Sequence, residues 1–97
     1  MKAIMISFDQ AHYDDVLAAL NASLARGFTM MPVTQGRGTK TGEPHYGTHA
    51  WPSMCSTIIT IVEDRQVEGL LERLHNIDKS SEMLGLRAFV WGVEKTI

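Results

Sequence analysis

Two kinds of hydrophobic periodicity alternate along this chain, and their order restricts the fold more than any other feature of the sequence. Apolar residues with the alternation or β-branched content of strands fill four segments, residues 1–8, 28–35, 54–62 and 86–93. Apolar residues recur at helical spacing in two segments. One runs from the predicted N-cap Asp9 to Gly27, and the other begins at the predicted N-cap Asp64. The order strand, helix, strand, strand, helix, strand predicts an α+β fold of the ferredoxin-like βαββαβ type.

The predicted strands are apolar on both faces. In the first strand Ala3 and Met5 oppose Ile4 and Ile6, and the third and fourth strands show the same property. Both helices of such a fold lie on one face because each crossover is right-handed, and an antiparallel sheet that faces water should carry polar residues there. We therefore expect other copies of the chain to cover the second face. The alternative is a monomer with an exposed apolar sheet.

Residues 36–53 separate the second and third strands and show no usable periodicity. They hold four of the eight glycines and two of the three prolines in the sequence. Structureless connections longer than about 12–15 residues are usually functional or disordered. In a chain of 97 residues, which we expect to form one domain over residues 1–97, this segment is predicted to be a long hairpin loop.

Charge and composition exclude several classes of protein. Nine Lys and Arg against eleven Asp and Glu give a formal charge of −2, so a nucleic-acid partner is not expected. The single cysteine, Cys55, cannot form an internal disulfide, and no stretch approaches the ~20 apolar residues of a membrane span. The first residues lack the apolar length and cleavage site of a secretory signal. We expect a cytoplasmic protein.

The start of the predicted loop has the composition of an anion-binding turn. Gly36, Arg37 and Gly38, followed by Lys40, would present backbone N–H groups and two cations to a bound anion. Glycines are equally needed for a hairpin tip, so a purely conformational role stays open. The hypothesis is a site for an anionic small-molecule effector.

Later in the loop the sequence offers donors for a metal. His45 and His49 lie four residues apart, and Cys55 follows on the third strand, so nitrogen and sulfur ligands for Zn²⁺ or copper are available. Their spacing matches no strict metal signature. Polar surface for the histidines and a small core position for Cys55 are the competing interpretations.

Aromatic residues in the loop suggest a surface for a protein partner. Trp51 stands beside a proline, and Tyr46 and His49 precede it. Exposed aromatic side chains of this kind suit docking, although Trp51 would also fit back against the sheet or a neighbouring subunit. No serine lies in an elbow sequence and nothing indicates an activated cysteine, so we do not expect an enzyme. His12 and His75 are predicted to face solvent on the helices.

Three segments of the chain resemble the PII family of nitrogen regulatory signalling proteins. They are DDVLAAL (residues 14–20), FTMMPVTQGRG (28–38) and RAFVWGVEK (87–95). The resemblance implies a homotrimer in which residues 36–53 form the T-loop, which docks onto a protein partner, with a membrane transporter as one option. It also implies an adenine nucleotide held between subunits. Its ligand-binding residues would be Gly36, Arg37, Gly38, Lys40 and Arg87.

The sequence departs from the PII pattern in two places. The family's second glycine-rich loop, TGxxGDGK, is replaced by DKSSEMLGLR, in which Arg87 falls where the lysine would be. The two phosphate-binding arginines that follow the last strand in the family are not found before Ile97. We therefore expect ATP or ADP to bind weakly.

A second functional class remains open. A protein that binds divalent or heavy metals, similar in architecture to the divalent-cation-tolerance family, would use His45, His49 or Cys55. The main prediction is nevertheless a PII-like regulatory protein that senses a small effector and binds its partner through the long loop.

Overall fold

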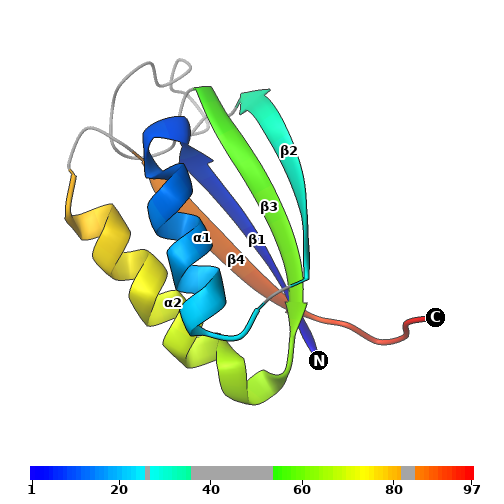
Figure 1. Ribbon diagram of the computed structural model, residues 1–97. Coiled ribbons are helices and arrows are strands. Elements are labelled where there is room, and N and C mark those ends of the chain that lie inside the picture. Colours follow the sequence, from blue (N-terminus) through cyan, green and yellow to red (C-terminus); the bar gives the residue numbers. More distant parts are fainter. Residues whose placement is uncertain (26, 36–53, 82–84) are drawn as a thin grey trace, which may run out of the picture.

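The computed structural model describes residues 1–25, 27–35, 54–81 and 85–97. Two α-helices lie together in front of an antiparallel sheet (Figure 1). The elements in chain order are β1 (Lys2–Asp9), the 3₁₀ turn η1 (Gln10–His12), α1 (Tyr13–Ala22), β2 (Phe28–Gln35), β3 (Met54–Val62), α2 (Asp64–Lys79) and β4 (Leu86–Gly92). This order confirms the predicted ferredoxin-like α+β fold.

The sheet has the strand order β2-β3-β1-β4, so β1 and β3 are central and β2 and β4 are edges. Both β3 and β4 pair antiparallel with β1, and β2 pairs antiparallel with β3. The end of β2 and the start of β3 therefore lie at one end of the sheet, where β4 also begins. The end of α1 and the start of α2 lie at the opposite end (Figure 1).

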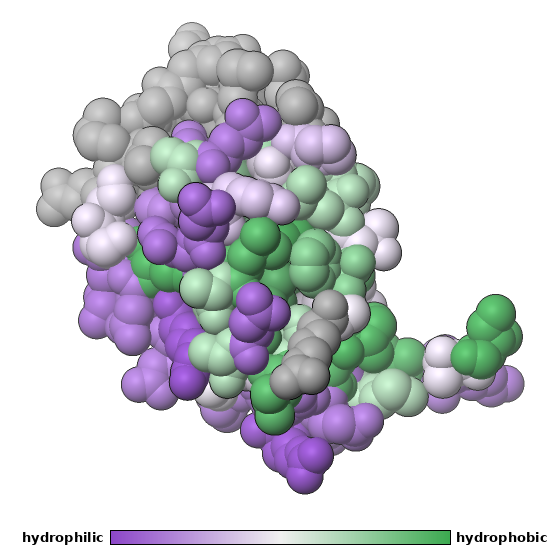
Figure 2. All heavy atoms as spheres, in the orientation of Figure 1, coloured by the Kyte–Doolittle hydropathy of each residue, from purple (hydrophilic) through white to green (hydrophobic). Residues whose placement is uncertain are grey.

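One hydrophobic core fills the space between the helices and the sheet, whose helix-facing side we call the covered face. Fully buried side chains from β1 and β3 meet those of Leu20 in α1 and Leu70 in α2. The buried core residues of the two central strands are Ile4, Ile6, Phe8, Ile58 and Val62. Removing a side chain of this size from water contributes about 1.5–3 kcal/mol, so this layer is the main source of stability. Figure 2 shows the hydrophilic surface that α2 presents outward.

The first helix ends earlier than the sequence indicated. We expected Gly27 to end it, but α1 ends at Ala22 in a Schellman motif. In this motif the Ala25 N–H donates to Leu20 O at 2.8 Å and the Leu24 N–H donates to Asn21 O at 3.1 Å. The left-handed position, which glycine usually fills, is taken by Leu24 with φ of 60°. A left-handed conformation costs a non-glycine residue about 1–2 kcal/mol.

Side chains cap the beginnings of the turn η1 and of helix α2, whereas His12, the N-cap of α1, forms no side-chain cap bond. Asp9 is an N-cap, but of η1, the turn that leads into α1, and not of α1 itself; its Oδ1 accepts from the Ala11 N–H at 2.9 Å. The prediction that His12 faces solvent was wrong, since its side chain is buried beneath the turn. The N-cap of α2 is Glu63 instead of Asp64, and Gln66 Oε1 accepts from the Glu63 N–H at 2.7 Å.

Pro32 lies where the sequence suggested an edge strand or a bulge, and both are present. Strand β2 is an edge, and its register shifts between Met31 and Thr34. The Pro32 carbonyl accepts hydrogen bonds from Ser56 Oγ at 2.6 Å and from Gln10 Nε2 at 3.0 Å. Side chains therefore satisfy a carbonyl at the irregular part of the ladder. Neither helix in the described ranges has the length and hydrophobicity of a membrane span.

Candidate functional site

The side of the sheet away from the helices, which we call the open face, has no cover from the described elements. Its residues alternate with those of the covered face, and the strand register arranges most of them in three cross-strand rows beyond the pair of Asp9 with Cys55. The rows are Arg87, Ser7, Thr57 and Met31; Phe89, Met5, Ile59 and Thr29; and Trp91, Ala3 and Ile61. Of these three rows the first lies nearest to the end of β2 and the start of β3, from which residues 36–53 connect, and only the pair of Asp9 with Cys55 lies nearer.

The first row is polar, and we call Arg87, Ser7 and Thr57 the polar row. Ser7 is opposite Thr57 on one side and opposite Arg87 on the other. The hydroxyls of Ser7 and Thr57 are 3.4 Å apart and buried, whereas the Arg87 side chain is exposed. In the part of the chain that the structure describes, Arg87 forms no ion pair with a carboxylate. A cation beside two hydroxyls is a suitable arrangement for an anion.

The other two rows are mainly apolar and carry large exposed side chains. Ile61 and Trp91 expose 48% and 47% of their surface, and Phe89 exposes 39%. Met31, at the end of the first row on β2, exposes 39%. Such an apolar surface is typical of an interface with another molecule. The prediction that the sheet is apolar on both faces is confirmed.

Only two of the predicted site residues lie in the described part of the chain. Arg87 is on edge strand β4 in the polar row, and Cys55 is on β3. Cys55 faces the same side as Thr57 but is only 1% exposed, which fits a small core residue better than an accessible metal ligand. Among the described residues, no three His, Cys, Asp or Glu side chains come together as metal ligands would.

The other predicted site residues lie outside the described ranges. They are Gly36, Arg37, Gly38 and Lys40 for the effector, Tyr46, His49 and Trp51 for the partner, and His45 and His49 for a metal. Their roles stay predictions.

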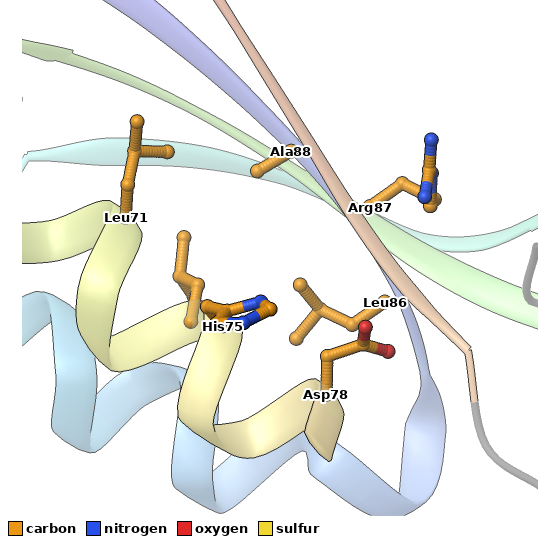
Figure 3. A pocket seen from close by; sticks show the side chains of 7 residues that line it. Leu71, His75, Asp78, Leu86, Arg87 and Ala88 are labelled. Atoms are coloured by element: carbon orange, nitrogen blue, oxygen red, sulfur yellow. The ribbon is translucent and has the colours of Figure 1, made fainter. Parts of the chain in front are cut away.

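A cavity of about 250 Å³ between α2 and β4 is the second candidate for a site (Figure 3). His75 and Asp78 lie one helical turn apart at its rim, and Leu74 and Leu86 contribute apolar walls. Figure 3 shows the Arg87 guanidinium turned away from these side chains, across β4. The three polar groups therefore do not converge on one ligand, and the cavity does not extend the polar row.

Sequence reasoning found Arg87 but missed Ser7 and Thr57. The signal for them was present, since each is a polar residue in an apolar strand. What the sequence could not provide was the register, which places the two residues opposite each other and beside Arg87. A one-residue slip would have moved them to opposite faces of the sheet.

The sequence profile of one family, P-II: Nitrogen regulatory protein P-II, matches residues 1–97. No curated protein matches the sequence. Several solved structures are similar in fold.

One of them is CPII, a nitrogen regulatory PII-like protein from Thiomonas intermedia K12, bound to ADP, AMP and bicarbonate. The two chains share 19% identity, with a TM-score of 0.67, over 99% of this chain and 94% of that chain. The apo form of CPII is 17% identical with a TM-score of 0.65, over 95% and 89% of the two chains. A protein of Thermus thermophilus assigned to the PII-like signaling proteins is 17% identical with a TM-score of 0.64, over 93% and 82%.

Proposed function

The chain belongs to the nitrogen regulatory protein P-II family, and we propose that it is a non-enzymatic signalling protein that senses a small anionic effector and reports it to a protein partner. The effector would be an adenine nucleotide or bicarbonate, the ligands named for the similar protein CPII. The polar row is the single observation that carries this proposal.

The polar row suits an anion because of what surrounds it. Arg87 stands at the edge of an otherwise apolar sheet face with no carboxylate partner among the described residues. An exposed guanidinium of this kind can form paired hydrogen bonds to the oxygens of a carboxylate or phosphate. The Ser7 and Thr57 hydroxyls, buried and 3.4 Å apart, make the sheet polar at the level of Arg87. This grouping supports Arg87 as an effector ligand.

The apolar rows support assembly through the open face. Three copies around a common axis, as the PII resemblance implies, would cover Phe89, Trp91 and Ile61 and bring each polar row beside a neighbouring subunit. An effector bound there would contact two subunits. Its presence would then be communicated to residues 36–53, whose connections to β2 and β3 start at the same end of the sheet.

We assign partner binding to residues 36–53, with Tyr46, His49 and Trp51 as the main contacts and Gly36, Arg37, Gly38 and Lys40 as further effector ligands. This assignment rests on the composition of the segment and on the chain order, in which it joins β2 and β3 at the end of the sheet near the polar row. Effector binding would change which partner surface the segment presents.

Titration calorimetry with ADP, AMP and bicarbonate tests the effector site. We expect saturable binding of at least one of the three, and Arg87→Gln should weaken it by about 10- to 100-fold, because hydrogen bonds to charged groups contribute ~1.5–3 kcal/mol. Lys79→Gln, which removes an exposed cation from the last turn of α2, is the matched control and should bind as the native protein does. Absence of binding for all three ligands, or unchanged affinity in Arg87→Gln, would refute the proposed site.

A further inference from the structure

A groove at the end of the molecule opposite to the polar row combines several features that the fold itself does not require. It has a volume of about 330 Å³ and lies between the turn after α1 and the first turns of α2. Ser23 and Leu24 line it from the turn, and Arg65, Gly69 and Arg73 line it from α2. We call it the helix-end groove. Figure 1 shows the end of α1 and the start of α2 that border it, far from the end of β2 and the start of β3.

Leu24 is unfavourable for folding in two respects. It holds the left-handed position of the Schellman motif, where glycine or asparagine would be unstrained. Its side chain is also 63% exposed, so burial in the core does not compensate for the strain. Strained residues kept at the surface are often found where a protein binds something.

Gly69 is unfavourable for a different reason. It lies in the interior of α2, where glycine is a poorer helix former than alanine. A Cβ atom at this position would meet no other atom within 4 Å, so close packing inside the chain does not explain the glycine. Gly69 and Leu24 line the same groove. A ligand that lies along α2 and packs against Leu24 would account for both.

The groove is positively charged. Arg65 and Arg73 are exposed, and neither forms an ion pair or hydrogen bond with another part of the described chain. Asp64, which precedes Arg65 in the sequence, is engaged with the amino group of Met1 at 3.1 Å. Glu68 and Glu72 of α2 do not line the groove. The charge of both arginines is therefore available to an acidic ligand.

The turn that forms one wall is held in place. Gln66 Nε2 donates to Ser23 O at 3.1 Å and to Leu24 O at 3.3 Å, which joins the turn to α2. The Ser23 hydroxyl is buried and has no hydrogen-bond partner in the described structure. The hydrogen bonds from Gln66 therefore fix the backbone of the turn at Leu24, beside the Ser23 hydroxyl that lacks a partner in the described structure.

We propose that the helix-end groove binds a short acidic segment of a protein partner. Carboxylates of the segment would pair with Arg65 and Arg73, and an apolar side chain between them would pack against Leu24 over Gly69. The arginines are eight positions apart, which is about 12 Å along a helix. An extended peptide covers this distance in roughly three to four residues, whereas a single small anion would pair with one arginine only.

This surface is separate from the proposed effector site and from the end of β2 and the start of β3. The groove and the polar row lie at opposite ends of the sheet, so both are accessible at once. A partner that uses the groove would remain bound whether or not the effector is present. The helix-end groove therefore serves as a docking site for a partner.

Selection from a random peptide library against the native protein tests the proposal. We expect enrichment of peptides with two acidic residues about three to four positions apart and an apolar residue between them. The variant R65E/R73E should bind these peptides with an affinity lower by 100-fold or more, and it should select basic peptides instead. The variant K79E/K95E, which changes the net charge equally outside the groove, should select the same peptides as the native protein.

Two further variants separate binding from folding. Leu24→Gly removes the left-handed strain and Gly69→Ala improves the helix, so neither should lower the thermal unfolding temperature. Both should weaken binding of the selected peptide by about 10-fold or more. Leu24→Gly removes the apolar side chain that the peptide contacts, and Gly69→Ala adds a methyl group where the peptide would lie against α2. Enrichment of peptides without acidic residues, equal competition by inorganic phosphate or by RNA, or unchanged affinity in both variants would overturn the proposal.

Discussion

On the covered face of the sheet Ile6 and Ile58 are completely buried beneath the two helices. On the open face Ile61, Phe89 and Trp91 expose 39–48% of their surface, although these side chains are as large or larger. The two faces thus have similar hydrophobicity and different degrees of burial. The sheet has one side that the two helices cover and another that the described elements leave uncovered.

The difference shows which part of the fold is self-sufficient. Full burial of a side chain such as Ile58 contributes about 1.5–3 kcal/mol, and the covered face collects this contribution within one chain. The open face gains only part of this burial free energy. Its small residues Ala3 and Ser7 are buried, whereas the large side chains Ile61, Phe89 and Trp91 stay exposed. Association would supply the remainder. If the open face is the surface through which copies associate, the free energy of unfolding should rise with protein concentration, and substitutions on the open face should remove this dependence.

A matched pair on strand β3 gives the largest expected effect. Ile58→Ala on the covered face should lower the free energy of unfolding by about 2–5 kcal/mol, because it leaves a cavity in a fully closed core. Ile61→Ala, at a position that is 48% exposed, should lower it by less than about 1 kcal/mol at low protein concentration. Urea unfolding of both variants measures the difference. Equal losses would mean that the open face is part of the intramolecular core.

The second prediction concerns association. Trp91→Ala should weaken self-association by about 2 kcal/mol or more per interface, since large aromatic side chains in the centre of an interface contribute most of its energy. Tyr13→Ala is the control, because Tyr13 is a similarly exposed aromatic residue on α1, away from the open face. Sedimentation velocity at micromolar concentration reports the assembly state. A native protein that is monomeric, or a Trp91→Ala variant of unchanged mass, would contradict assembly through this face.

Much of the fold could be predicted from the sequence, because it depends on local periodicity. Strands β2 and β3 have the predicted bounds, and the edge position and bulge at Pro32 follow from its missing N–H donor. The order of the elements then left few arrangements open, since both crossovers must be right-handed.

The predictions were wrong for the end of the first helix and for the burial of His12, because tertiary contacts determine both. A glycine normally takes the left-handed position after a helix, but the chain turns at Leu24, before Gly27, so that Leu20 before the turn and Ala25 after it are both buried in the core. His12 is beside polar residues in the sequence, yet the turn η1 places it under the protein surface. Spacing along the chain does not contain this information.

The candidate site was predictable only in part for the same reason. Arg87 was found through the PII resemblance, whereas Ser7 and Thr57 became partners only through the register of β1 and β3. Pairing of this kind joins residues fifty positions apart and cannot be derived from local pattern.

The smallest effect is expected from two buried serines on opposite faces. Ser56→Ala on the covered face removes the 2.6 Å hydrogen bond to the Pro32 carbonyl, so it should lower the free energy of unfolding by about 1 kcal/mol. Ser7→Ala on the open face removes only a 3.4 Å contact with Thr57, and the loss should be about 0.5 kcal/mol or less. The two serines are equally buried, 4% and 5% exposed, so burial does not separate them. In thermal unfolding, 1 kcal/mol corresponds to roughly 4–8 °C for a domain of this size. A drop as large for Ser7→Ala as for Ser56→Ala would show that the hydroxyl pair holds the fold together, and the polar row would lose its interpretation as a binding surface.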